Sequence, residues 1–300
     1  MRVRYDLTSL EVFVAVAETA NLTRAAELQH LAVSAISKRI AELEEVTGTA
    51  LLQRHARGVS LTPAGHSLLH YARQVLQLME RMRGELSEYA GGLKGVIRLH
   101  ASTSALVQFL PPELHAFIER YPMIRLQIEE RTGAAIVRAV IDGTADMGIL
   151  GNHTPLKGLE ALPYHSDRLA LAVPRRHELG QRKSVRFAEA LGFDFVAPHA
   201  ESSLWTLMTQ AARSAGKVLE PRIQVSSFEC TCLLVEAGLG IALLPERIVA
   251  PRVEAGNMAL VRLKDPWAQR QIQIVVRDLD NTPFTTRALI DHLREPATPV

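Results

Sequence analysis

The stretch NLTRAAELQHLAVSAISKRIAELE, residues 21–44, contains two short amphipathic runs with almost no room between them. A turn is expected at about residues 29–32. The second run is predicted to be a helix from about residue 33 to residue 46. Its inward face, at positions i, i+4 and i+7, is formed by Ile36, Ile40 and Leu43.

Small and hydroxyl-bearing residues and two adjacent cations lie at the front of this second helix. Ser34 and Lys38 are four residues apart and share a stripe, with Ser37 beside them. Hydroxyls can bond base edges or phosphates, and a lysine can reach guanine or phosphate, so this front suits the major groove of DNA. Two short helices joined by a tight turn form a helix-turn-helix. The alternative at this point is a solvated face in a small helical bundle.

A candidate wing follows the two helices. The segment LLQRHARGVSLTP, residues 51–63, is predicted to form two short strands around a turn that carries Arg54 and Arg57. Residues 1–64 contain seven Lys or Arg and seven Asp or Glu, so this part is not basic overall. The cations gather at the turn, the helix front and the wing, while three of the acids lie within 42–45. This separation favours one DNA-facing surface.

Residues 6–65 resemble the N-terminal winged helix-turn-helix of LysR-type transcriptional regulators. The matching segments are NLTRAA (21–26), AISKRIAELE (35–44), LLQR (51–54) and LTPAG (61–65), with Asp6, Leu7, Leu10, Phe13, Val16, Ala17 and Gly48. The family usually has a glutamine and a proline where this chain has Val33 and Ser34. Val33 cannot hydrogen-bond a base, but it can touch a thymine methyl group. The resemblance implies DNA binding through Thr23, Arg24, Val33, Ser34, Ser37, Lys38, Arg39, Arg54 and Arg57.

A long helix is predicted from residue 62 to about residue 90. A threonine N-cap followed by proline begins it, and two glycines at 91–92 end it. Apolar residues recur along it at the spacing of a coiled-coil seam. They are Leu68, Ala72, Val75, Met79, Met82 and Leu86. The expected partner is the same helix of a second chain, as the resemblance also implies; the alternative is packing against the chain's own C-terminal part.

Residues 93–300 alternate strand-like and helix-like segments, which favours an α/β architecture with parallel sheets. The resemblance covers this part more loosely and implies the two-lobed fold of type-2 periplasmic binding proteins, with two crossings between the lobes. The predicted domains are a winged helix-turn-helix (1–64), a linker helix for dimerisation (65–92) and an effector-binding domain (93–300). Lobe one is placed at 93–165 and 267–300, and lobe two at 166–266.

Hydroxyl and amide side chains gather where the predicted strands of this α/β part end. Ligands of such sheets bind beyond the carboxyl ends of the strands. Several of these residues also start helices, where free N–H groups favour an anion, although an ordinary N-cap is the alternative for any single serine. No Arg or Lys is evident in these turns, so the expected donors are N–H groups and hydroxyls. The predicted effector is a small organic anion bound by Ser102, Thr103, Ser104, Thr132, Asn152, Ser202, Ser203 and Phe228.

Composition and motifs argue against several other classes of protein. The 300 residues carry a net charge of only +2, two cysteines and no apolar run long enough for a membrane span, so a cytoplasmic protein of two or three domains is expected. The sequence has no phosphate-binding loop, no G-x-S-x-G and no H-E-x-x-H, so neither an enzyme nor a cofactor or metal site is predicted. Cys230 and Cys232 are interpreted as buried small residues, with a redox sensor as the alternative.

These features together predict a LysR-like, ligand-responsive transcriptional regulator. Its expected partners are double-stranded DNA with an inverted-repeat operator, the small effector, and further copies of the chain in a homodimer or homotetramer. RNA polymerase is a further candidate partner. The competing hypothesis is a DNA-independent small-molecule binder that uses its winged helix as an interaction module.

Overall fold

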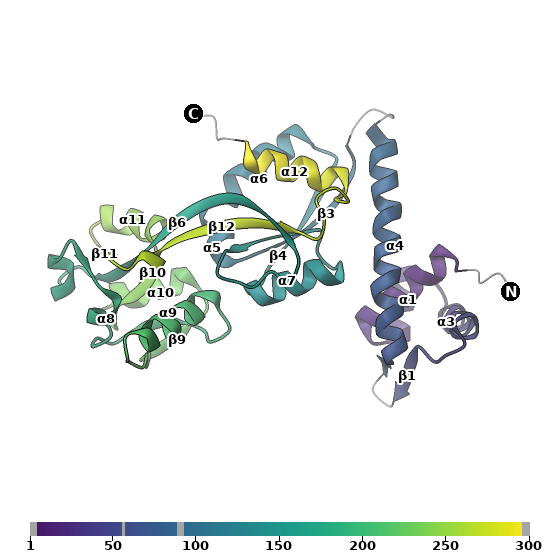
Figure 1. The fold of residues 1–300 in the computed structure, drawn as a ribbon, viewed down its shortest axis with the longest axis horizontal. Coiled ribbons are helices and arrows are strands. Elements are labelled where there is room, and N and C mark those ends of the chain that lie inside the picture. Colours follow the sequence, from purple (N-terminus) through teal and green to yellow (C-terminus); the bar gives the residue numbers. More distant parts are fainter. Residues whose placement is uncertain (1–4, 56–57, 89–92, 296–300) are drawn as a thin grey trace. The chain divides into compact units, whose positions relative to one another are not determined.

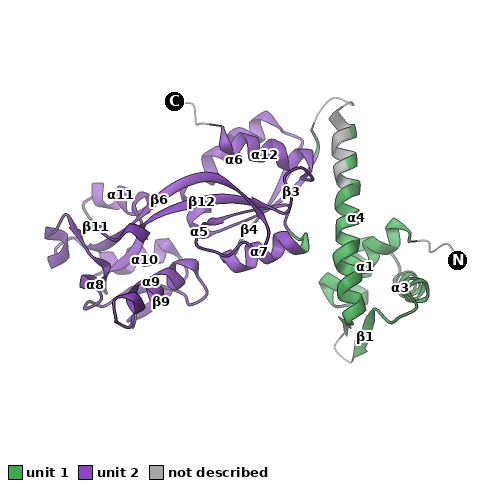
Figure 2. Cartoon of the chain, viewed as in Figure 1, with its two compact units in different colours: residues 1–94, 142–144 green, residues 95–141, 145–300 purple. Residues whose placement is uncertain are grey.

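A computed structural model describes residues 5–55, 58–88 and 93–295 of the chain, which divides into two compact units (Figures 1 and 2). Unit 1 comprises residues 1–94 with 142–144, and unit 2 comprises residues 95–141 with 145–300. Each unit has apolar cores of its own. Among the described helices, none combines the length and the apolar character needed to cross a membrane.

Unit 1 begins with three helices, α1 (Leu7–Thr19), α2 (Leu22–Gln29) and α3 (Val33–Thr47). Polar side chains begin the first two, because Asp6 accepts a hydrogen bond from the Ser9 amide at 2.9 Å and Asn21 accepts two from the first turn of α2. Gly48, with a φ of +66°, ends α3 in the left-handed conformation. Side chains from all three helices form one core, which includes Leu10, Val12, Phe13, Val16, Ala25, Ala26, Ile36, Ile40 and Leu43.

A two-stranded wing follows α3, and its strands β1 (Leu52–His55) and β2 (Gly58–Leu61) pair antiparallel. The Glu44 carboxylate on α3 accepts hydrogen bonds from the amides of residues 51 and 52, at 2.8 and 3.1 Å, and so ties the wing to that helix. A Cβ on Gly58 would lie 2.3 Å from a carbonyl oxygen at the end of α1. The wing can therefore approach α1 this closely only with glycine at that position.

Helix α4 (Pro63–Glu88) completes unit 1. Its start is capped by the Thr62 hydroxyl, which accepts a hydrogen bond from the Gly65 amide at 3.0 Å. A Cβ on Gly65 would lie 2.2 Å from a backbone oxygen at the foot of the wing, so the helix begins in direct contact with that segment. Leu68 and the fully buried Ala72 then pack on the core of unit 1.

Unit 2 is built on a sheet with the strand order β4, β3, β5, β12, β6, β11, β7, and β10 also pairs with β6. These strands are β3 (Gly95–Ala101), β4 (Ile124–Glu130), β5 (Met147–Gly151), β6 (Glu160–Pro174), β7 (Ser184–Val185), β10 (Ala242–Pro245), β11 (Met258–Leu263) and β12 (Gln269–Val276). A separate parallel pair is formed by β8 (Val196–Pro198) and β9 (Ile223–Val225).

Helices cover this sheet, and two 3-10 turns (Glu178–Gln181 and Pro266–Ala268) lie among the connections. The helices are α5 (Thr103–Gln108), α6 (Leu110–Arg120), α7 (Gly133–Asp142), α8 (Phe187–Ala190), α9 (Ser203–Ser214), α10 (Phe228–Glu236), α11 (Glu246–Glu254) and α12 (Phe284–Arg294).

The strand β6 belongs to both lobes of unit 2 (Figure 1). Its residues 160–168 pair with β12, and its residues 169–174 pair with β10 and β11. Strands β3, β4 and β5 of lobe one pair parallel, as the sequence predicted. The pairings of β12 with β5 and β6, and of β6 with β10 and β11, are antiparallel. The expectation of parallel sheets is therefore corrected to sheets with both parallel and antiparallel pairings. The strands that connect the lobes, β6 and β12, are antiparallel to their neighbours.

Candidate DNA-binding surface and effector cleft

The outward face of α3 carries the side chains that the sequence assigned to DNA contact. Val33, Ser34 and Lys38 are exposed, and Ser37 is half-buried beside them. The core-facing side chains of the same helix are fully buried. A methyl-bearing side chain, two hydroxyls and one amine are thus available on one helical face, and these groups can contact thymine methyls, base edges and phosphates.

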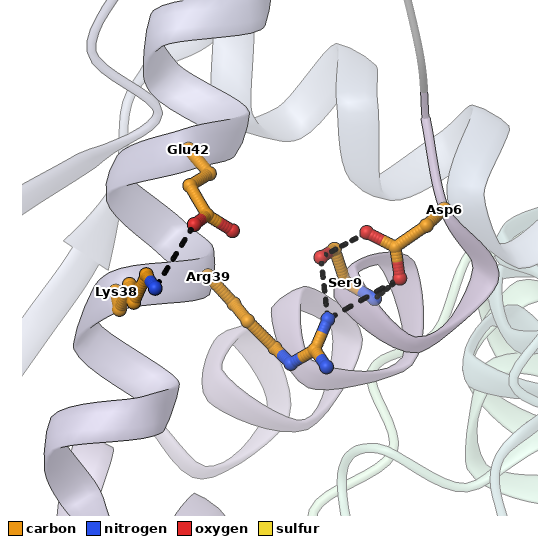
Figure 3. Close-up of polar contacts among 5 residues, drawn as sticks. All are labelled: Asp6, Ser9, Lys38, Arg39 and Glu42. Carbon is orange, nitrogen blue, oxygen red and sulfur yellow. Dashed lines mark hydrogen bonds and ion pairs between the residues drawn. The ribbon is translucent and has the colours of Figure 1, made fainter.

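Arg39 is oriented differently from its neighbour Lys38 (Figure 3). Its Nη1 donates hydrogen bonds to Asp6 Oδ1 at 3.3 Å and to Ser9 Oγ at 3.2 Å, which ties α3 to the start of α1. Hydrogen bonds from the Ser9 hydroxyl and amide lower the pKa of Asp6, so the carboxylate is ionised beside this guanidinium. Arg39 therefore makes contacts within unit 1, and its contact with DNA stays a prediction. Among the described residues, Lys38 has only an exposed ion pair with Glu42 at 3.8 Å, which is a weak restraint.

The remaining residues that were predicted to contact DNA lie on α2 and the wing. Thr23 and Arg24 are exposed in the first turn of α2, where their amides donate to the Asn21 side chain. Arg54 is exposed on β1. Arg57 lies outside the described residues.

The described part of α4 carries a row of apolar side chains that are 40–63% exposed: Tyr71, Val75, Leu78, Met82 and Leu86. This row differs from the predicted seam at its start, because Leu68 and Ala72 are used in the core of unit 1. Tyr71 and Leu78 were not predicted, and Met79 is half-buried. Such a row on one side of a helix is the kind of apolar patch that marks a protein–protein contact.

A cavity of about 290 Å³ in unit 2 is lined by both lobes. Lobe one contributes the ends of β3 and β4 and the starts of α5 and α7, and lobe two contributes the ends of β8 and β9 and the starts of α9 and α10. The predicted effector residues that line it are Ser102, Thr103, Ser104, Thr132, Ser202, Ser203 and Phe228. Asn152 does not line it. Its backbone N–H donates to the Gln271 carbonyl at 2.9 Å, beyond the end of β5.

The serine hydroxyls around this cavity, which is the candidate effector cleft, differ in their hydrogen-bond partners. Ser102 is only 9% exposed, and its hydroxyl has no hydrogen-bond partner among the described residues. The Ser104 hydroxyl accepts a hydrogen bond from Arg270 Nη2 at 3.3 Å, so its own proton can point into the cavity. Ser202 is an N-cap, because its oxygen accepts from the Trp205 amide at 3.0 Å.

Four ionisable residues of the cleft were missed in the sequence: Glu130, Arg131, His199 and Glu201. Thr103 donates a hydrogen bond of 2.5 Å to Glu130 Oε1, and Arg131 donates to Glu129 at 2.7 and 2.9 Å. The expectation that no Arg or Lys lies at these turns is therefore wrong. Arg131 directly precedes Thr132, and the end of β4 was the only signal that could have indicated it.

A buried ion pair lies where the strands β6 and β12 pair. Arg270 Nε donates to Asp167 Oδ1 at 2.8 Å, and Arg270 Nη2 donates to Asp167 Oδ2. Gln108 donates to the same carboxylate at 2.9 Å. Both charged side chains are almost completely buried. Because Arg270 also bonds Ser104, the pair connects the inter-lobe strands to the cleft.

A winged helix-turn-helix, a long helix with an exposed apolar row and a two-lobed unit with a polar cleft together describe a ligand-responsive DNA-binding regulator. The chain belongs to the LysR family of such regulators. The family model described as "LysR substrate binding domain" matches residues 90–297, and the model "Bacterial regulatory helix-turn-helix protein, lysR family" matches residues 7–66. It is therefore a LysR-type transcriptional regulator with a DNA-binding and an effector-binding part, and the predicted family and function are confirmed.

Relatives of known name match nearly the whole chain. The uncharacterised HTH-type transcriptional regulator YbhD of Escherichia coli is 27% identical, over 91% of this chain and 86% of its own length. Among solved structures, full-length BenM is 28% identical, with a TM-score of 0.56 and coverage of 97% and 96%. A full-length OxyR variant from Pseudomonas aeruginosa is 21% identical, with a TM-score of 0.79 and coverage of 98% and 96%, and shows the same fold.

Proposed function

We propose that this regulator reads an operator with the outward face of α3, supported by α2 and the wing. The observation that carries the proposal is the division of α3 into a buried side and an exposed side with Val33, Ser34, Ser37 and Lys38. Thr23 and Arg24 on α2, and Arg54 on the wing, supply further contacts to the DNA backbone, as does the sequence-predicted Arg57. The protein acts in the cytoplasm, where its operator lies.

A salt titration of operator binding tests this surface. Lys38→Ala removes one cation that contacts phosphate, so affinity should fall and the slope of log affinity on log salt should decrease by about 1. Lys183→Ala is the matched control, because Lys183 is an exposed lysine of unit 2. Equal slopes for both variants and the parent chain would refute the assignment of Lys38 to the DNA surface.

The proposed assembly is a homodimer through the exposed apolar row of α4. Two copies would place two winged helices on the two halves of an inverted repeat, and a homotetramer would join two such dimers. Val75→Glu puts an uncompensated charge into each of two facing helices, which is strongly unfavourable. Sedimentation should then detect smaller species, whereas His66→Glu, at an exposed position of the same helix, should leave the oligomer intact. An intact oligomer in the Val75 variant would contradict the proposal.

The effector is proposed to bind in the cavity between the lobes and to favour one arrangement of the protein over another. A ligand shifts such an equilibrium only by its difference in affinity for the two states. Ser102→Leu fills the cavity with an isobutyl group and should abolish the effector response of operator binding. Ser214→Leu, at the far end of α9, is the control. A response that survives with unchanged effector affinity in the Ser102 variant would place the ligand elsewhere.

The competing function is a DNA-independent binding protein. The exposed hydroxyl and amine face of α3 disfavours it, because an interaction module needs apolar anchors more than it needs hydrogen-bond donors. RNA polymerase is proposed as a further partner, and transcription measured with purified components would test this contact.

A further inference from the structure

The effector cleft contains carboxylates that would repel a ligand with only a negative charge. Two carboxylates, Glu130 and Glu201, line it, together with the guanidinium of Arg131 and the imidazole of His199. Arg131 is already paired with Glu129, which is not a lining residue. Glu201 has neither an ion pair nor a hydrogen bond to its carboxylate within the part of the chain that the structure describes. Among the carboxylate and guanidinium groups of the lining, the charge left facing the cavity is therefore negative.

Anion-binding groups are nevertheless abundant in the same cavity. Three helices of nine or more residues, α7, α9 and α10, begin at it, and their first N–H groups favour a negative charge. Ser102 as a residue is more than nine-tenths buried and lines the cavity, and its hydroxyl has no partner among the described residues. The hydroxyl of Ser104 is oriented by Arg270, which leaves its proton for a ligand. These donors stabilise an anionic group inside the cavity.

The carboxylates require a different group of the ligand. Glu130 accepts a short hydrogen bond from Thr103 and keeps further lone pairs, and Glu201 keeps all of its acceptor capacity. A ligand with only a negative charge would meet like charges at both residues. A protonated amine would donate to them through charge-assisted hydrogen bonds.

From this distribution, resting on the proposed function of the cleft, we infer that the effector is a zwitterion. It carries a carboxylate or similar anion together with a protonated amine, and is the size of an amino acid, given the cavity of about 290 Å³. The anionic group lies among the hydroxyls and helix starts, and the ammonium lies between Glu130 and Glu201. The partly buried Phe228 provides an apolar wall for the remainder of the ligand.

Thermal shift and calorimetry with the full chain test this inference. The probes are the standard L-amino acids, with one-charge analogues of two of them: 4-methylpentanoate and 3-methylbutylamine for leucine, and 3-phenylpropanoate and 2-phenylethylamine for phenylalanine. At least one amino acid should bind, and analogues that lack either of its charges should bind at least about tenfold more weakly.

Isosteric variants identify the side chains. Glu201→Gln should lower the affinity for the amino acid by about tenfold or more and leave binding of the deaminated acid unchanged or tighter. Glu220→Gln, at an exposed glutamate of unit 2 outside the cleft, should change neither. Glu130→Gln keeps the acceptor for Thr103 and should behave as Glu201→Gln does.

The outcomes separate the ligand class from the cleft. Binding of one-charge acids that equals or exceeds amino-acid binding, and that Ser102→Leu abolishes, would overturn the zwitterion while leaving the cleft as the effector site. Amino-acid binding that Ser102→Leu leaves unchanged would refute the cleft itself. The absence of a thermal shift with every amino acid at millimolar concentration would also overturn the inference.

Discussion

Removal of the guanidinium of Arg270 should strongly destabilise unit 2. In Arg270→Met, the Asp167 carboxylate remains buried and loses both hydrogen bonds from Arg270. Of its partners among the described residues, only Gln108 is left. Ser104 also loses its donor. An uncompensated buried charge of this kind costs about 3–5 kcal/mol in the free energy of unfolding. The loss of the bond to Ser104 adds about 0.5–1.5 kcal/mol.

The double variant Arg270→Met/Asp167→Leu should recover much of this loss. Neither side chain then carries a charge, and apolar pairs of similar volume are often as stable as the ion pair they replace. The expected coupling energy from the double-mutant cycle is about 2–3 kcal/mol. The chain's two tryptophans, Trp205 and Trp267, both belong to unit 2, so their fluorescence during urea unfolding reports this unit. A double variant that is as unstable as Arg270→Met would refute the reasoning.

Three further measurements address single features. Hydrogen bonds lower the pKa of Asp6 in the folded chain from its ordinary value of 3.8. The Asp6 carboxylate therefore stabilises the folded chain above pH 3.8, and this stabilisation is lost as the pH falls through the lowered pKa. Asp6→Asn should therefore speed hydrogen exchange of α1 at pH 7 and show a smaller difference from the parent chain near pH 3. Burial raises the pKa of the Cys232 thiol, so iodoacetamide at pH 8 should modify Cys230 first. Intact-mass spectrometry should detect one modification in the folded chain and two after unfolding in urea. Gly65→Ala should destabilise unit 1 by about 1–3 kcal/mol through its 2.2 Å backbone clash, as measured by thermal melting, whereas Gly192→Ala meets no atom within 4 Å.

Local features of unit 1 could be predicted from the sequence because neighbouring residues create them. The caps Asp6 and Asn21, the glycine stop at Gly48 and the buried face of α3 all depend on spacings of a few residues. The bond from Arg39 to Asp6 joins residues 33 positions apart, so no local pattern indicates it. The helical position of Arg39, next to Lys38, predicted a DNA contact and gave no sign of this bond.

The sequence predicted the hydroxyl-bearing residues of the cleft but not its ionisable residues. Strand ends and N-caps identify serines such as Ser102 and Ser202, because both features follow from local sequence. Glu201 and His199 lie in a connection whose path depends on the whole second lobe. The pair of Asp167 and Arg270 spans 103 positions and becomes visible only when β6 and β12 are brought into register.

Helix α3 has separate sets of residues for anchoring the helix and for facing the solvent, and this separation affects how the protein can change over evolutionary time. Arg39 and Glu44 hold the helix to α1 and to the wing, and the apolar side chains hold it to the core. Val33 and Ser34 are exposed and take no part in that anchoring. Surface substitutions of this kind usually alter stability by less than about 0.5 kcal/mol. A lineage can therefore alter the operator it recognises at these positions one residue at a time, without passing through a sequence that fails to fold.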